Sequence, residues 1–242
     1  MPQTSKSGKY FFISLASIVG LLLIIFLFYL IYYTIQLRYG SSETIQKIVS
    51  TYEKNFSSII DKDAPADVAN YQTLIKSDNP KKGEATAPIT IIAFMDFECP
   101  YCQDNYSVFK YVTNKYSPVL QIVFKNLPLT EIHSNALPSA LAASCANDQG
   151  KFWEYYDRLY TDKNLTEENF YSLAKTLNLD SVQFDNCYKN KIHINQIEAD
   201  LQDAAKIGLR GTPTYVVNGE VVEGEITNQQ WDDLIIKYLN KK

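Results

Sequence analysis

The chain has 242 residues, of which 46% are hydrophobic, and its formal net charge is −4. This length is sufficient for one membrane-spanning segment and one mid-sized domain. The negative charge and the scarcity of basic clusters argue against nucleic acid as a partner, because nucleic-acid-binding surfaces concentrate lysine and arginine.

The N-terminal part consists of a short tail, residues 1–9, and a stretch without any charged side chain, residues 10–33. As a helix this stretch would extend about 36 Å, more than the ~30 Å hydrocarbon core of a bilayer. Secretory signal peptides have apolar regions of only about 7–15 residues and end in small residues, whereas this stretch ends in Tyr29, Tyr32 and Tyr33. We therefore predict an uncleaved transmembrane anchor, with a cleaved leader as the alternative.

The orientation of this span is not fixed by charge, since Lys6 and Lys9 before it are nearly balanced by Arg38 and Lys47 after it. The short tail with its free α-amine favours a cytoplasmic N-terminus. The even number of cysteines favours a compartment that permits disulfides for the large domain. We therefore predict a cytoplasmic tail and place the remainder of the chain in the periplasm or at the cell surface.

Residues 34–78 are predicted to form a helical stalk and linker. Apolar residues recur there at alternating steps of four and three residues: Ile45, Val49, Tyr52, Phe56 and Ile59. Because this seam is shorter than three heptads, we favour a stalk that packs on its own domain over a coiled coil that pairs two chains. The turn-rich segment from Ser77 to Gly83 then breaks the periodicity, and we place the start of the C-terminal domain near Asn79.

A strand pattern at Pro88 to Phe94 is followed by Cys99-Pro100-Tyr101-Cys102 and by a helical pattern from Gln103 to Tyr116. Two thiols with this spacing at a strand-to-helix turn form a redox centre, because the unpaired N–H groups and the positive end of the helix dipole stabilise a thiolate at Cys99. The same spacing also supplies half of a zinc site. Cys145 and Cys187 stand alone in the sequence and supply no second pair, so we favour redox chemistry.

The elements that follow complete an α/β domain. A second strand pattern at residues 119–124 gives a β-α-β start, and the pattern is then helical from about residue 131 to 208, which predicts an inserted helical block. Strand patterns return at residues 214–217 and 220–223, joined by Asn218-Gly219, a strong hairpin signal. An amphipathic helix at residues 228–239 closes the domain.

In this order the motifs resemble those of DsbA-like proteins of the thioredoxin superfamily. The matching stretches are Phe94-x-Asp96-Phe97-x-Cys99-Pro100-Tyr101-Cys102, Pro128-Leu129 with His133 and Ala136, Gln149-Gly150-Lys151-Phe152-Trp153-Glu154-Tyr155, Phe184-x-x-Cys187, and Gly211-Thr212-Pro213-Thr214 with Val217-Asn218-Gly219. The resemblance implies a thioredoxin fold for residues 79–242, with the helical insertion at about 131–208. The transmembrane helix and the helical stalk precede this α/β fold and lie outside the resemblance.

The resemblance also implies roles for the site residues. Cys99 would be a solvent-exposed nucleophile, and Cys102 would be the shielded partner that resolves the mixed disulfide. Pro213 would be a cis-proline facing the pair, and Thr212 would offer backbone hydrogen bonds to a bound substrate. Apolar surface around Cys99, to which we assign Tyr101, would bind unfolded segments. Neither a metal nor a cofactor is expected.

The remaining cysteines and both histidines receive structural roles. The resemblance implies a structural disulfide between Cys145 and Cys187, and two buried free thiols are the alternative. We interpret His133 as a polar residue near the domain junction and His193 as a surface residue. The two histidines are too few and too scattered for a metal site.

The sequence departs from the family pattern before and within the C-x-x-C motif. Related proteins often carry a glutamate six residues before the first cysteine, where it can relay a proton, and Ala93 stands there. Asp96 or Glu98 would serve instead, unless both simply lie on the solvated end of the strand. Pro100 and Tyr101 are uncharged, so the dipeptide does not establish an oxidising potential.

Together these observations predict a membrane-anchored thiol–disulfide oxidoreductase that forms disulfides in secreted proteins. Its substrates would be unfolded or reduced proteins, and the resemblance implies reoxidation by a quinone-linked membrane partner. A disulfide reductase or isomerase is the enzymatic alternative. A hypothesis of another class is a tethered metal carrier in which Cys99 and Cys102 hold a soft ion.

Overall fold

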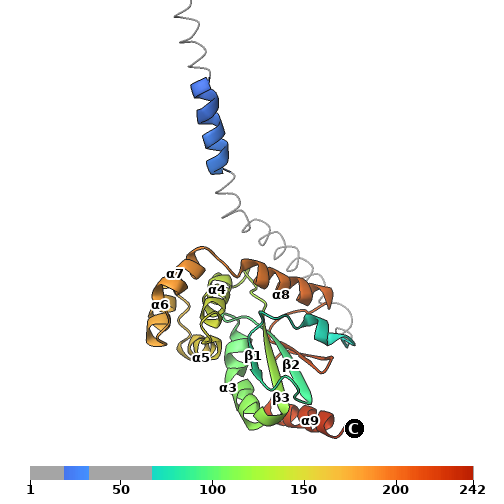
Figure 1. Cartoon of the computed structure of the whole chain (residues 1–242). Helices are drawn as coiled ribbons and strands as arrows, with labels where there is room; N and C mark the ends of the chain where they lie inside the picture. Colours follow the sequence, from blue (N-terminus) through green and yellow to red (C-terminus); the bar gives the residue numbers. More distant parts are fainter. Residues whose placement is uncertain (1–18, 33–66, 242) are drawn as a thin grey trace, which may run out of the picture. The chain divides into compact units, whose positions relative to one another are not determined.

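The computed structural model describes residues 19–32 and 67–241, which belong to two separate compact units (Figure 1). In the first unit, residues 19–32 form one helix with mostly exposed side chains. Within the described residues, no helix is both long and apolar enough to cross a membrane.

Several predicted features fall on residues that the structure does not describe. The tail, residues 1–9, and the heptad seam from Ile45 to Ile59 lie outside the described residues. The predicted span, residues 10–33, also lies outside them except for the helical part at residues 19–32.

A five-stranded mixed sheet with the strand order β1-β3-β2-β4-β5 forms the centre of the second unit. The strands are β1 (Lys81–Gly83), β2 (Ile89–Met95), β3 (Leu120–Asn126), β4 (Thr214–Val217) and β5 (Glu220–Glu223). Among the described strands, β2 and β3 alone pair in parallel, and every residue of both is buried, as expected for strands covered on both faces. Ala93 in β2 lies opposite Phe124 in β3 and Tyr215 in β4.

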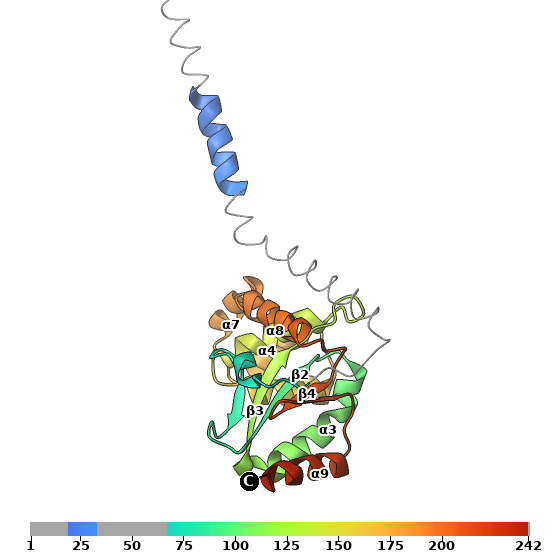
Figure 2. The same ribbon diagram turned by 90° about the vertical axis from the view of Figure 1, so that its right-hand side faces the viewer.

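Helices cover both faces of this sheet (Figures 1 and 2). The helical elements are η1 (Tyr71–Leu74), α3 (Pro100–Lys115), η2 (Ser117–Val119), α4 (Ala136–Asn147), α5 (Phe152–Asp162), α6 (Glu167–Thr176), α7 (Ser181–Lys189), α8 (Ile194–Lys206) and α9 (Asn228–Leu239). Phe109 of α3 and Trp231 of α9 pack in the core on one face, and Ile197 of α8 packs in the core on the other. The β-α-β start and the helical insertion between β3 and β4 agree with the predicted α/β fold.

The domain begins on the N-terminal side of the predicted boundary at Asn79. The backbone N–H of Val68 donates to the Gly219 carbonyl at 2.7 Å, and Leu74 is buried in the core beneath α8. The buried Lys125 ammonium donates to the Leu74 carbonyl at 2.8 Å. Residues 67–78, part of the predicted stalk and linker, therefore pack as part of the domain.

The predicted hairpin turn is present between β4 and β5. Asn218 and Gly219 have φ values of 47° and 98°, the backbone conformation that Asn-Gly adopts in two-residue hairpin loops. A Cβ atom at Gly219 would lie 2.8 Å from the Val68 carbonyl oxygen. Glycine is therefore required here both by the turn and by the close approach of the N-terminal segment.

Candidate active site

Cys99 lies at the N-cap of α3, directly after the loop that follows β2. Pro100 occupies the first turn, where its missing N–H costs no helical hydrogen bond. The Cys99 carbonyl accepts the first helical hydrogen bond, from the Gln103 N–H, at 3.0 Å. The Cys99 sulfur therefore stands at the end of the helix where unpaired N–H groups favour a negative charge.

A loop from a distant part of the sequence covers the Cys99 thiol. Cys99 Sγ lies 3.3 Å from the Thr212 carbonyl oxygen of this loop, and the Thr212–Pro213 peptide bond is cis. Cys99 is consequently only 3% exposed. The expectation of a solvent-exposed nucleophile is wrong for this reason, although Cys102, at 0%, is more deeply enclosed.

The surroundings of the two thiols shift their pKa values in opposite directions. A hydrogen bond with the Cys102 thiol lowers the pKa of Cys99 from 9.0 to about 6, against the opposing effect of burial. Bonds from the Thr212 side chain and the Cys102 backbone act in the same direction. Burial raises the pKa of Cys102 well above its ordinary value, and the Cys99 thiolate raises it further. These opposite shifts favour a thiolate at Cys99 and a protonated thiol at Cys102.

The Thr212 hydroxyl is a buried polar group at this site. Among the described residues it has no hydrogen-bond partner while Cys99 donates its thiol proton to the Thr212 carbonyl. Once Cys99 is ionised, its sulfur can accept a hydrogen bond from the Thr212 hydroxyl. The lowering of the Cys99 pKa by the Thr212 side chain fits this exchange of roles.

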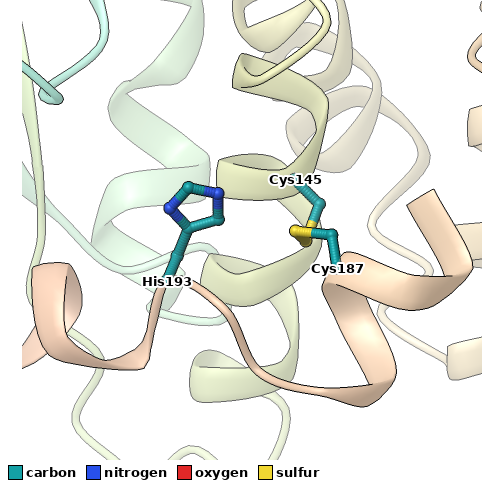
Figure 3. A group of neighbouring side chains, drawn as sticks. All are labelled: Cys145, Cys187 and His193. Carbon is teal, nitrogen blue, oxygen red and sulfur yellow. A yellow bond between two sulfur atoms is a disulfide. The ribbon is translucent and has the colours of Figure 1, made fainter. Parts of the chain in front are cut away.

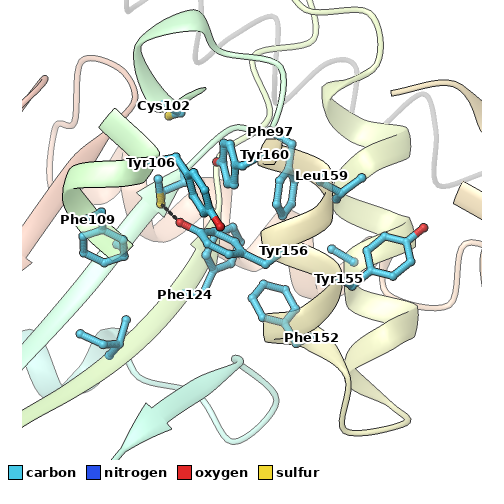
Figure 4. Close-up of a cluster of buried hydrophobic side chains, with 14 of the residues drawn as sticks. Phe97, Cys102, Tyr106, Phe109, Phe124, Phe152, Tyr155, Tyr156, Leu159 and Tyr160 are labelled. Atoms are coloured by element: carbon cyan, nitrogen blue, oxygen red, sulfur yellow. Dashed lines mark hydrogen bonds between the residues drawn. The ribbon is translucent and has the colours of Figure 1, made fainter. Parts of the chain in front are cut away.

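Cys102 adjoins an aromatic cluster that joins α3 to the inserted helical block (Figure 4). The cluster comprises Phe97, Tyr106, Phe109, Phe124, Phe152, Tyr156 and Tyr160. Tyr106 stacks on Tyr160 with ring centroids 5.4 Å apart, and Phe97 stacks on Phe124 at 5.5 Å. These rings exclude water from Cys102, which accounts for the large effect of burial on its thiol.

Tyr101 projects from the first turn of α3 between the two cysteines and is 62% exposed. Its ring therefore offers apolar surface beside the pair, as its position in the motif predicts. Its contact with substrate remains a prediction.

Asp96 and His133 join the site although the sequence indicated their roles only weakly. The Asp96 carboxylate is 1% exposed and lies 2.7 Å from His133 Nδ1, so the solvated-strand-end interpretation of Asp96 is wrong. His133 lies between β3 and α4, where the helical insertion begins, as its domain-junction interpretation predicts. Glu98 accepts hydrogen bonds from the Asn135 backbone at 2.5 Å and side chain at 3.1 Å. The segment between β3 and α4 thus holds both carboxylates beside Cys99.

Cys145 of α4 and Cys187 of α7 form a disulfide, with an S–S distance of 2.02 Å (Figure 3). His193, which we had interpreted as a surface residue, is partly buried next to it, with Nε2 2.8 Å from Asp148 Oδ2. Cys145, Cys187 and His193 are the one group of three potential metal ligands found within the described residues. Because the two sulfurs are bonded to each other, neither is a thiolate available to a metal.

Three solved structures illustrate the similarity in fold. A thioredoxin-like oxidoreductase from Silicibacter pomeroyi is 22% identical, with 72% of this chain and 99% of that chain covered and a TM-score of 0.64. BdbD from Bacillus subtilis is 22% identical, with 74% and 99% covered and a TM-score of 0.63. The thiol-disulfide exchange protein alpha-DsbA2 from Wolbachia pipientis is 18% identical, with 80% and 98% covered and a TM-score of 0.63.

At these identities the likeness shows the fold, and it confirms the fold that the motifs predict. Among curated proteins, the chain is 34% identical over 139 residues to Na(+)/H(+) antiporter NhaA 3 from Salinispora tropica. It is 32% identical over 143 residues to Na(+)/H(+) antiporter NhaA 1 from Mycolicibacterium gilvum. Each match covers 57% of this chain, but only 21% and 23% of those proteins, so the chain spans less than a quarter of their length.

The comparison that covers most of the domain is with a protein family. The family model described as thioredoxin matches residues 76–237, a range that contains both cysteine pairs and the Thr212-Pro213 loop. This range is about two thirds of the chain and coincides with the sheet and the helices around it. The chain therefore belongs to the thioredoxin family.

Proposed function

We propose that this protein is a thiol–disulfide oxidoreductase that uses Cys99 and Cys102 as its redox pair. The observation that carries the proposal is the position of Cys99 at the N-terminus of α3, where its pKa is lowered to about 6 while Cys102 keeps its proton. A thiol that is ionised near neutral pH attacks disulfides and also leaves readily from them.

In the oxidising direction, a substrate thiolate attacks Cys99 Sγ of the Cys99–Cys102 disulfide. The bond between the two enzyme sulfurs breaks, and Cys102 leaves as a thiolate and takes up a proton. A second substrate thiolate then attacks the substrate sulfur of the mixed disulfide and releases Cys99 as a thiolate. The substrate loses two electrons and forms one disulfide, and the enzyme is left reduced.

Two observations support the oxidising direction. The lowered pKa of Cys99 stabilises the reduced enzyme, and a disulfide whose reduced form is stabilised is a stronger oxidant. The second disulfide, Cys145–Cys187, is typical of proteins that fold where disulfides persist. Reduction or isomerisation would use the same two sulfurs in the reverse order.

The substrates we propose are unfolded or reduced proteins. Exposed Tyr101 provides an apolar contact beside Cys99, and Thr212 and Pro213 form the loop that faces its sulfur. A substrate segment bound along this loop would bring its own sulfur to Cys99. The exposed apolar ring implies little preference for sequence.

We also propose that the uncharged stretch at residues 10–33 anchors the protein as a single span, with the domain outside the cytoplasm. Reoxidation would then come from a quinone-linked membrane partner, as the resemblance implies. Extraction of membranes with alkaline carbonate, followed by protease digestion of intact cells, tests this arrangement. Release of the full chain by carbonate, or full protection of the domain in cells stripped of their outer layers, would contradict it.

Trapping of reaction intermediates tests the chemistry. When incubated with a disulfide-bonded substrate protein, Cys102→Ala should accumulate mixed disulfides on a non-reducing gel, because the resolving thiol is missing. Cys99→Ala should accumulate none. Equal trapping by both variants would overturn the assignment of the nucleophile.

Two further measurements separate the alternatives. A reduction potential as low as about −270 mV, measured against glutathione or a dithiol, would favour a reductase over an oxidase. Stoichiometric copper or zinc in protein purified without reductant, together with no disulfide exchange, would support the metal carrier instead.

A further inference from the structure

The loop between β3 and α4 places an ion pair against the segment that precedes Cys99. The Asp96 carboxylate accepts hydrogen bonds from the Glu98 N–H at 2.8 Å and the Leu129 N–H at 3.0 Å. His133 Nδ1 lies 2.7 Å from its Oδ2 atom. The carboxylate is 1% exposed, so protein groups rather than water surround it.

The position of Asp96 creates an electrostatic conflict with the proposed chemistry. Its backbone carbonyl accepts a hydrogen bond from the Cys99 N–H at 3.3 Å, so the carboxylate belongs to the same tight turn as the nucleophile. A buried negative charge disfavours a second one nearby. Asp96 accordingly opposes ionisation of both Cys99 and Cys102.

His133 is placed to offset that charge. The hydrogen bond to Asp96 raises the pKa of His133, and the negative charges of Cys99 and Glu98 raise it further. The pKa of Cys99 is about 6, so the thiolate and the imidazolium coexist from about pH 6 up to the raised pKa of His133. Across this range the positive charge of His133 balances the Asp96 carboxylate.

The other titratable groups around the pair come from two further elements. Cys102 in α3 is influenced by Asp96 but keeps its proton. Tyr160 in α5 donates its hydroxyl to the Asp96 backbone carbonyl at 3.2 Å, and burial raises its pKa well above the ordinary value. Both groups are neutral near pH 7. Of His133, Cys102 and Tyr160, only His133 can carry a positive charge beside the Asp96 carboxylate.

We propose that His133 is a positioning residue for disulfide exchange: its positive charge neutralises the buried Asp96 carboxylate and thereby keeps the Cys99 thiolate stable. This proposal rests on the proposed function of the Cys99–Cys102 pair. It assigns His133 no contact with substrate and no transfer of a proton during the reaction.

A charge cycle in the full chain tests the proposal. His133→Gln removes the positive charge but keeps an amide donor, Asp96→Asn removes the negative charge, and the double variant removes both. The readout is the rate at which iodoacetamide alkylates Cys99 in the reduced protein between about pH 4 and 9, followed by mass spectrometry. This reaction requires no protein substrate, so it is independent of the exchange assay.

In His133→Gln we expect the midpoint of the Cys99 titration to rise by roughly one pH unit, which slows alkylation at pH 6 by roughly fivefold. Asp96→Asn alone should lower the midpoint or leave it in place. The double variant should return towards the wild-type midpoint, because both charges are gone. If His133→Gln does not fold, His133→Asn removes the same charge and should raise the midpoint in the same way.

The chain also contains a matched control. His193 pairs with Asp148 at 2.8 Å, as His133 pairs with Asp96, but it lies beside the Cys145–Cys187 disulfide. His193→Gln should leave the Cys99 midpoint unchanged. An unchanged midpoint in His133→Gln, or a double variant with a midpoint as high as that of His133→Gln, would overturn the proposal even if exchange proceeds normally. If the wild-type protein does not catalyse disulfide exchange, the proposed function on which this inference rests is overturned instead.

Discussion

The two cysteine pairs differ in how they are joined to the fold. Cys99 and Cys102 stand three positions apart at the first turn of α3, and both sulfurs are free thiols. Cys145 and Cys187 are 42 positions apart and connect α4 to α7. One pair is therefore held by a single helix end, and the other holds two helices together.

Burial alone does not distinguish the pairs, since all four cysteines are buried. The difference lies in the groups next to the sulfur. Cys99 lies at a helix N-terminus and receives hydrogen bonds that stabilise its thiolate, one of them from the Cys102 thiol. The backbone position of each cysteine thus decides whether its surroundings favour a thiolate or a disulfide between two helices.

The largest effect is expected from removing the nucleophile. Cys99→Ser should reduce disulfide exchange to the uncatalysed level, because a serine hydroxyl cannot form a mixed disulfide. Below about pH 6, where the Cys99 thiolate adds no stability, the thermal stability of the reduced protein should change little, since the serine occupies nearly the same volume. Residual exchange carried by Cys145 and Cys187 in this variant would erase the distinction between the pairs.

Removing the other pair should have the opposite outcome. In the chain-entropy model, a disulfide that closes a loop of 42 positions stabilises the fold by about 4 kcal/mol. Cys145→Ala/Cys187→Ala should therefore lower Tm by about 10 °C, measured by calorimetry. Exchange at Cys99 should stay within about twofold of wild type while the protein is folded. If the folded double variant loses exchange, this pair takes part in electron transfer.

The reduced and oxidised forms should differ in how stability depends on pH. The folded pKa of Cys99, about 6, lies below its ordinary value of 9.0. Its stabilising contribution is therefore complete above about pH 9 and is lost as pH falls through about 6. The Cys99–Cys102 disulfide does not titrate. Melting curves of both forms should diverge as pH rises from about 6 to 9, with the reduced form gaining stability. Parallel curves would contradict the lowered pKa.

A small effect is expected at the helix that carries Cys187. The Asp180 side chain caps α7 by accepting hydrogen bonds from the Val182 and Gln183 N–H groups, both at 2.9 Å. Asp180→Ala should destabilise the domain by about 1 kcal/mol, measured by urea unfolding. Exchange rates should match wild type. A change in exchange without a change in stability would link α7 to the Cys99 site.

Local features of the fold could be predicted from the sequence. The predicted closing helix coincides with α9, and Asn218-Gly219 forms the predicted turn, because periodicity and turn chemistry act over a few residues. The C-x-x-C motif after a strand pattern likewise placed Cys99 at the start of a helix.

Contacts between distant residues could not be predicted in this way. His133 reaches Asp96 across 37 positions, and Thr212 covers Cys99 across 113 positions. Both depend on how loops lie against the sheet, which no local pattern specifies. The packing of Leu74 under α8 was missed for the same reason, since a short helical turn after a stalk pattern resembles a linker.

Alkylation of the four cysteines after stepwise reduction tests most directly whether Cys99 is the reactive sulfur of this protein. The full chain would be treated with increasing dithiothreitol near pH 7, labelled with iodoacetamide and analysed by mass spectrometry. We expect Cys99 to be labelled first, Cys102 to remain unlabelled in the folded protein, and Cys145 and Cys187 to react only after denaturation. Labelling of Cys102 before Cys99, or of Cys145 or Cys187 at the same dithiothreitol concentration as Cys99, would contradict the assignment.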